Sequence, residues 1–162
     1  MQSPGRLSRW QAWLATLWAG AVVVVGGLAA PALFLVLPRE LAGSGAGRIF
    51  HLEAQLSLFM AVLIFVMERR RVRDAVESGA QQSAMSATLL MTLVVLFLTI
   101  LGQHVLHPMI QAARQGSPSG LSFAALHGLS AALYWIKALI LLVMSWRLMA
   151  ALSPTPAQHL SA

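Results

Sequence analysis

The sequence contains no cysteine and few charged residues. The absence of cysteine excludes disulfide bonds, thiolate nucleophiles, thiolate zinc sites and iron–sulfur clusters. Charged residues make up 10% of the chain, whereas a soluble globular domain has about 25%. The chain also lacks a glycine loop for phosphate, a paired set of carboxylates and an HExxH motif. We therefore expect no enzyme activity.

Apolar residues are abundant instead. Of 162 residues, 58% are hydrophobic, and the mean hydropathy is +0.74. Four apolar runs reach the length of about 20 residues that an α-helix needs to cross a bilayer. The sequence predicts one all-α domain over residues 1–162, an integral membrane four-helix bundle. Its helices are expected at residues 10–37, 49–67, 85–105 and 121–149, with Pro38 and Pro108 ending the first and third.

The distribution of arginine predicts how the helices cross the membrane. Short loops favour antiparallel neighbours, so alternate loops lie on the same side. The formal charge of +6 comes from arginines at the ends of the apolar runs. The charge therefore reflects how the chain crosses the membrane, and we expect no nucleic-acid partner. Seven arginines fall on the N-terminal side and three on the other: Arg6, Arg9, Arg69, Arg70, Arg71, Arg73 and Arg147 against Arg39, Arg48 and Arg114. By the positive-inside rule both termini are cytoplasmic.

The location of the tryptophans agrees with this orientation. Trp10, Trp13 and Trp146 would lie at the cytoplasmic interface, where an indole buries its ring and keeps its N–H in water. Ten arginines against one lysine are typical of a GC-rich bacterial genome. We expect a multi-pass protein of the bacterial cytoplasmic (inner) membrane.

Four histidines are predicted to lie in the outer leaflet, together with one acidic residue. This polar cluster comprises His51, Glu53, His104, His107 and His127. His104 and His107 share a helix face and could meet His127 of the next helix. Imidazole binds copper, zinc and haem iron, so these three are the candidate metal ligands. The first expectation is no cofactor, with imidazoles bonded to backbone and water; a haem or copper/zinc site and a proton relay are the alternatives.

Lys137 is an ionisable residue near the middle of the fourth run. A lysine there costs about 2.5 to 3.5 kcal/mol on insertion scales, so a partner is required. If the second helix begins at Ile49, Glu53 lies one turn inside it, so direct contact with Lys137 would need a long reach by both side chains and is the less favoured alternative. We expect Lys137 to meet an interior amide or a hydroxyl such as that of Thr88 or Thr92, or to belong to a subunit contact.

Small residues recur along one face of the first predicted helix. Gly20, Gly27 and Pro31 follow one another at roughly helical spacing. Small residues let helices approach closely in lipid, which predicts a helix-packing face, and Pro31 predicts a kink.

Six short stretches share the pattern of a known family. They are Leu17–Gly20, Ala30–Phe34, Leu37–Pro38, Gly47–Phe50, Leu106–Met109 and Phe123–Ser130. They resemble the transmembrane protein 205-like family, whose bacterial members form the domain of unknown function 4149. The last stretch is similar to the family's F-x-x-x-H-G-x-S signature, which singles out His127 and Ser130.

The resemblance implies a four-helix membrane protein without an established catalytic residue. The chain departs from the family pattern at Met109, where a basic residue is commoner, and at Lys137, where an uncharged amide is expected. A eukaryotic relative is associated with resistance to platinum drugs, which implies transport of metal compounds. Copper-resistance membrane proteins, a more distant likeness, also group histidines at one face of a bundle.

These observations favour a small accessory or scaffold protein that contacts the lipid bilayer. We expect it to pack with itself as a homo-oligomer, or with a larger membrane complex. Two alternatives remain open: a histidine-based metal or haem protein, and a transporter or exporter of small cationic or metal-containing solutes.

Overall fold

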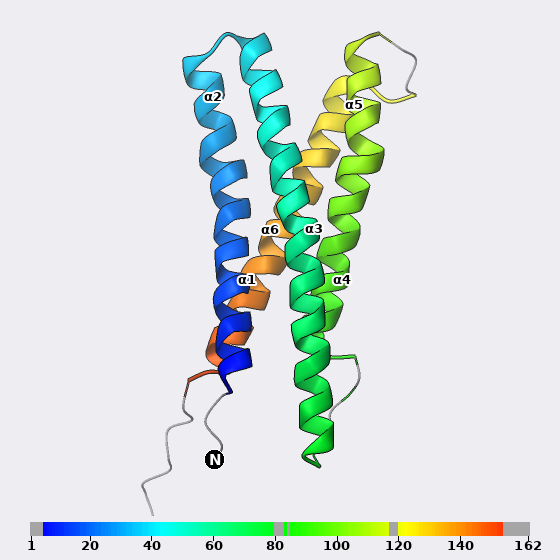
Figure 1. Cartoon of the computed structure of the whole chain (residues 1–162). Coiled ribbons are helices and arrows are strands. Elements are labelled where there is room, and N and C mark those ends of the chain that lie inside the picture. The colour runs from blue at the N-terminus through cyan, green and yellow to red at the C-terminus, as the bar shows by residue number, and fades with distance from the viewer. Residues whose placement is uncertain (1–4, 80–82, 84, 117–119, 154–162) are drawn as a thin grey trace, which may run out of the picture.

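The computed structural model describes residues 5–79, 83, 85–116 and 120–153, and every regular element in these ranges is helical (Figure 1). The elements form four rods, each long and apolar enough to cross a membrane. Two rods contain a short π-helical stretch, named η. The rods are α1 (Arg6–Val24) with η1 (Val25–Ala29) and α2 (Ala30–Val36); α3 (Arg39–Glu77); α4 (Ala87–Ile100) with η2 (Leu101–Leu106) and α5 (His107–Arg114); and α6 (Phe123–Ala150).

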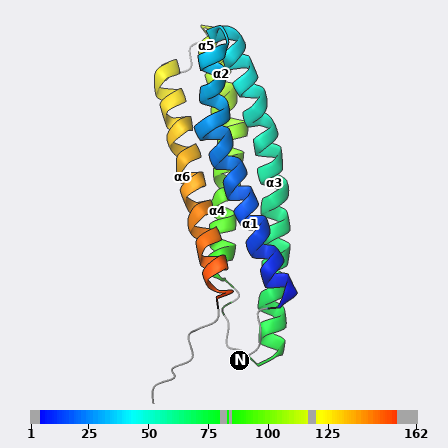
Figure 2. The same cartoon turned by 90° about the vertical axis from the view of Figure 1, so that its left-hand side faces the viewer.

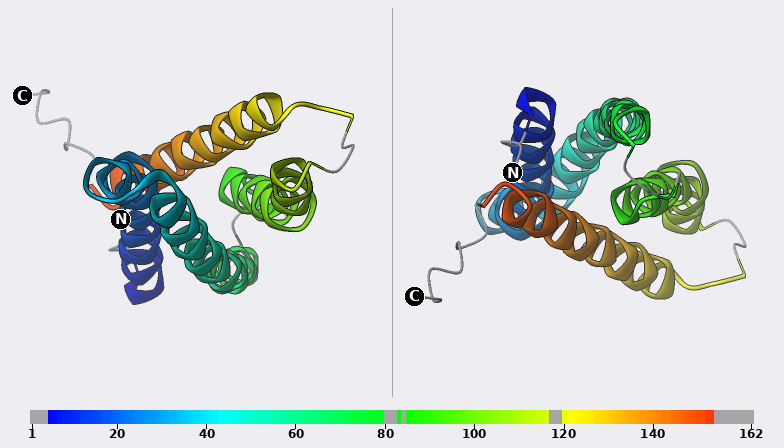
Figure 3. Two further views of the ribbon diagram at one scale, coloured as in Figure 1. Left: turned by 90° about the horizontal axis from the view of Figure 1, so that it is seen from above. Right: turned by 90° about the horizontal axis from the view of Figure 1, so that it is seen from below.

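Each of the four rods packs against two others. α3 packs against α1 and α4, and α6 also packs against α1 and α4. In Figure 1 the rod of α1 and α2 runs up from the N-terminus, α3 returns down, the rod of α4 and α5 runs up, and α6 returns. α6 starts beside α5 and crosses toward α1 (Figures 1 and 3). The start of α1 and the end of α6 therefore lie at the same end of the bundle (Figure 2).

The second rod is longer than its apolar run predicts. α3 begins at Arg39 rather than Ile49, and it ends at Glu77 rather than Met67. A hydropathy profile identifies only the apolar part of a helix, which can lie in the hydrocarbon of a bilayer. The helix continues past that part where the flanking polar residues favour helical structure. Glu40 in the first turn is such a residue, because an acidic group there complements the helix dipole.

The third rod does not end at Pro108. Pro108 lies in the first turn of α5, directly after η2, and the helix continues to Arg114. Pro31 has the same relation to η1 and α2. A proline in a first turn needs no partner for its missing N–H, and the wider π-helical turn precedes it. The irregularity that Pro31 predicts therefore occurs as η1.

The interior of the bundle combines small and large apolar side chains from α1, α3, α4 and α6. The buried cluster comprises Ala15, Trp18, Ala19, Val22, Met60, Ala61, Ile64, Val95, Ala138, Leu141 and Met144. Large apolar side chains also cover the outside, with Leu35 86% exposed and Trp146 77% exposed. In water such a surface would drive association; in a bilayer, lipid covers it.

Candidate functional site

A buried ion pair joins α3 and α6. Lys137 Nζ lies 2.9 Å from both carboxylate oxygens of Glu53. Lys137 is 4% exposed and Glu53 is 5% exposed. Each charge therefore has its counter-ion inside the bundle, as a charged group removed from water requires.

This contact contradicts the expectation that Lys137 prefers a partner other than Glu53 because Glu53 lies near the outer surface. Glu53 lies fourteen residues from the first residue of α3 (39 to 53), and Lys137 lies fourteen from that of α6 (123 to 137). Both helices start at the same end (Figure 1), so both residues lie about 21 Å along their axes at about 1.5 Å per residue. The error came from starting the helix at Ile49.

The threonines expected beside Lys137 have other partners. Thr92 donates its hydroxyl hydrogen bond to the Thr88 carbonyl at 2.8 Å, and its Oγ1 lies 3.6 Å from Met144 Sδ. Lys137 instead bonds to Glu53, and the hydroxyl in this network belongs to Ser57, which donates to Glu53 Oε1 at 2.5 Å. Ser57 also accepts a hydrogen bond from Trp18 Nε1 at 2.9 Å. This chain of bonds connects the ion pair to α1.

An aromatic side chain covers the lysine. Lys137 Nζ lies 4.7 Å from the centre of the Tyr134 ring, a cation–π distance. The Tyr134 hydroxyl donates to the Val22 carbonyl at 2.7 Å, and Phe50 meets the Tyr134 ring edge-on at 5.1 Å. Gly26 makes room for the ring, since an added Cβ would lie 2.4 Å from Tyr134 Cε1.

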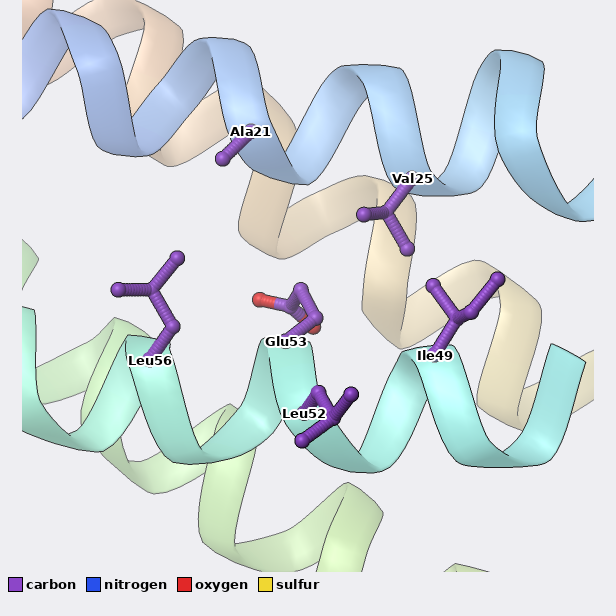
Figure 4. Close-up of a pocket in the computed structure, with 6 residues that line it drawn as sticks. All are labelled: Ala21, Val25, Ile49, Leu52, Glu53 and Leu56. Carbon is purple, nitrogen blue, oxygen red and sulfur yellow. The ribbon is translucent and has the colours of Figure 1, made fainter.

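Glu53 also borders a groove between α1 and α3. Figure 4 shows its carboxylate pointing toward α1, among apolar side chains of both helices. The groove has a volume of about 210 Å³ and is lined by Glu53 together with Ala21, Val25, Ile49, Leu52 and Leu56. Leu52 is 54% exposed, so the groove opens to the outside. The only ionisable group in its lining is thus the carboxylate that Lys137 neutralises.

A family model described as a domain of unknown function, DUF4149, matches residues 13–118. The chain belongs to the DUF4149 family. The matched segment contains Trp18, Glu53 and Ser57, whereas α6, with Lys137, follows it. No curated protein and no solved structure matches the chain.

The histidines of this DUF4149 protein are divided among separate contacts. Nδ1 of His51 lies 2.7 Å from Nε2 of Gln103, a hydrogen bond between α3 and η2. His127 stacks on Phe123 of its own helix, with ring centres 5.8 Å apart.

His104 is exposed in η2, His107 is half-buried at the start of α5, and Ser130 is half-buried in α6. Among the described residues, no three His, Asp or Glu side chains are grouped closely enough to hold a metal ion. The predicted outer cluster is therefore divided, because Glu53 faces Lys137 while His51 contacts η2.

A second buried carboxylate was missing from the sequence-based candidates. Glu68 is fully buried and accepts hydrogen bonds from Gln11 at 2.8 Å, from Arg71 at 2.7 and 2.9 Å, and from Ser86 at 2.5 Å. Glu68 directly follows the second predicted helix, residues 49–67, where a charged residue reads as the polar end of a span. Gln11 inside the first apolar run was the available signal, because a buried amide requires a polar partner.

The predicted packing face of helix one is largely unused within the chain. Gly20 and Pro31 are exposed, and a Cβ at Gly20 would meet nothing within 4 Å. A Cβ added at Gly27 would lie 3.4 Å from the Trp135 ring, and the closest such approach along this rod is at Gly26. The packing face of Gly20, Gly27 and Pro31 therefore stays a prediction, now for a contact with a helix outside this chain.

Proposed function

We propose that this DUF4149 protein is a non-enzymatic accessory or scaffold subunit of a membrane assembly. It contributes a rigid four-span unit that packs laterally with another copy or with a larger membrane complex. The likeness to transmembrane protein 205 and the location in a bacterial cytoplasmic membrane belong to this proposal.

The observation that carries the proposal is the internal pairing of the membrane charges. Lys137 and Glu53 neutralise one another at 2.9 Å, and Ser57 and Trp18 extend that network within the chain. These bonds join α1, α3 and α6, so they stabilise the arrangement of the helices. The extensive apolar exterior is then the surface available for partners.

The size of the protein in its native membrane tests this role. Full-length chain would be extracted with its surrounding lipid by a membrane-solubilising polymer, and subunits counted by single-molecule photobleaching. We expect particles with two or more copies, or particles that exceed one 17.4 kDa chain because they contain a stoichiometric partner. Single chains without a partner, at native expression level, would contradict the scaffold role.

We further propose that both termini lie in the cytoplasm. The absence of cysteine allows the orientation to be tested with single substitutions. Ser44 and Ser78 are exposed near opposite ends of α3. A membrane-impermeant maleimide should label Ser44→Cys in cells whose outer membrane has been permeabilised, and should label Ser78→Cys only after the inner membrane is opened. The reverse pattern would invert the topology.

A second candidate function is transport of a small cation, and the groove at Glu53 is the observation that favours it. A carboxylate reached from an open apolar groove could exchange its lysine partner for a passing cation. In proteoliposomes, Glu53→Gln should then abolish flux, whereas Glu40→Gln, at an exposed carboxylate of the same helix, should not. Equal flux in both variants would remove this candidate.

A further inference from the structure

The start of α1 carries a hollow lined by two arginines and two tryptophans. Arg6, Arg9, Trp10 and Trp13 surround a space of about 380 Å³. Their spacing places all four on one face of the helix. Gln11, on another face, is fully buried in the bundle, so the hollow faces outward.

Within the part of the chain that the structure describes, the two arginines have no counter-ion. No acidic residue lies in the first turn of α1. The three carboxylates at this end, Glu68, Asp74 and Glu77, each pair with an arginine of α3. Among the described residues, neither Arg6 nor Arg9 therefore has an ion-pair partner, and an anion from outside the chain would complete the hollow.

The tryptophans indicate the depth at which that anion lies. Trp10 is 63% exposed and Trp13 is 57% exposed, at the point where the apolar run of the first span begins. Exposed indoles at the end of a span favour the boundary between headgroups and acyl chains. Arg6 and Arg9 lie nearer the N-terminal end of the helix than the indoles, and so lie among the lipid phosphates.

We propose that this hollow binds the headgroup of an anionic phospholipid. The guanidinium groups of Arg6 and Arg9 form charge-assisted hydrogen bonds with the phosphate oxygens. The rings of Trp10 and Trp13 contact the glycerol and ester region beneath. A soluble phosphate would use only the arginines, so the indole walls favour the lipid as the source. The site does not depend on the scaffold role.

Lipid binding to full-length protein in detergent tests the site. Native mass spectrometry would follow the titration of phosphatidylglycerol, with phosphatidylcholine as the neutral comparison. The variant Arg6→Gln/Arg9→Gln should bind phosphatidylglycerol about twenty-five-fold more weakly, at about fivefold per arginine. Arg70→Gln/Arg73→Gln removes the same charge from arginines that are already paired, and should stay close to wild type.

Two further arms separate the possible sources of the anion. Trp10→Leu/Trp13→Leu should weaken phosphatidylglycerol binding while both arginines remain. Glycerol phosphate without acyl chains should fail to displace the lipid. Equal losses in the two arginine variants would show general surface charge, and displacement by glycerol phosphate would show a soluble-anion site; either result would overturn the proposal. Circular dichroism confirms that each variant is folded.

Discussion

Replacing Lys137 by methionine removes one charge from the bundle interior and leaves the Glu53 carboxylate without its partner. Methionine has nearly the length of lysine, so the packing against Tyr134 changes little. The substitution therefore tests the ion pair rather than the shape of the core. We expect a clear loss of stability, because nothing else in the described contacts of Glu53 carries a positive charge.

The separation of the charges sets the magnitude. At 2.9 Å between Nζ and the carboxylate oxygens, an effective dielectric constant of about 20 gives an attraction of about 6 kcal/mol. Desolvation of both groups offsets part of it, and removal of one partner from a buried pair costs about 3 to 5 kcal/mol. For a chain of this size that lowers the Tm by about 6 to 20 °C.

The double variant separates pairing from packing. Glu53→Gln/Lys137→Met leaves no charge unpaired, and it retains an amide that can bond to Ser57. It should therefore recover most of the stability that either single variant loses. Thermal unfolding in detergent, followed by tryptophan fluorescence, measures all four proteins, with Glu40→Gln as a surface control. A single variant as stable as the wild type, or a double variant that loses the sum of both single losses, would refute this account.

Three other predictions follow from close contacts. Gly26→Ala should lower unfolding free energy by about 1 to 3 kcal/mol, because its Cβ displaces Tyr134; Gly20→Ala, with free space, should be neutral or stabilising in the same melt. Glu68→Gln should cost about 1.5 to 3 kcal/mol, whereas Glu77→Gln, in an exposed pair, should cost less than about 0.5 kcal/mol. Purified protein should show neither a Soret band nor stoichiometric copper or zinc by elemental analysis, and either finding would revive the histidine site.

The four spans were predictable because the hydropathy of a segment indicates directly whether lipid or water surrounds the helix. The ion pair was not predictable, because its depth depends on where each helix begins, and the polar start of α3 at Arg39 does not stand out in an apolar profile. Lys137 and Glu53 were each identified as unusual. To predict that they pair, one must know that α3 and α6 start at the same end of the bundle. One must also know that the two residues lie equally far along their helices.

The role of Gly26 was hidden for a related reason. Regular helical spacing selects Gly20 and Gly27, whereas the glycine that lies against Tyr134 is Gly26, inside η1. The sequence displays the proline that follows the π-helical stretch, but it does not display which glycine of the stretch meets an aromatic ring of another helix.

Polar contacts explain how α1 keeps its position although half of its buried residues are alanine. Within lipid, apolar contact between helices has little advantage over contact with acyl chains, so polar bonds between helices supply specificity. Gln11 bonds to Glu68 of α3, Trp18 bonds to Ser57 of α3, and the Val22 carbonyl accepts from Tyr134 of α6.

These three positions of α1 lie seven and four residues apart, so they follow a single face of the helix. A rotation or a one-residue slip of α1 would break all three bonds together, leaving buried polar groups without partners. The buried alanines of α1, Ala12, Ala15 and Ala19, then need only to let the neighbouring helices approach α1 closely. The polar contacts therefore specify the register of α1, and Gly20, where an added Cβ would meet nothing within 4 Å, takes no part in it.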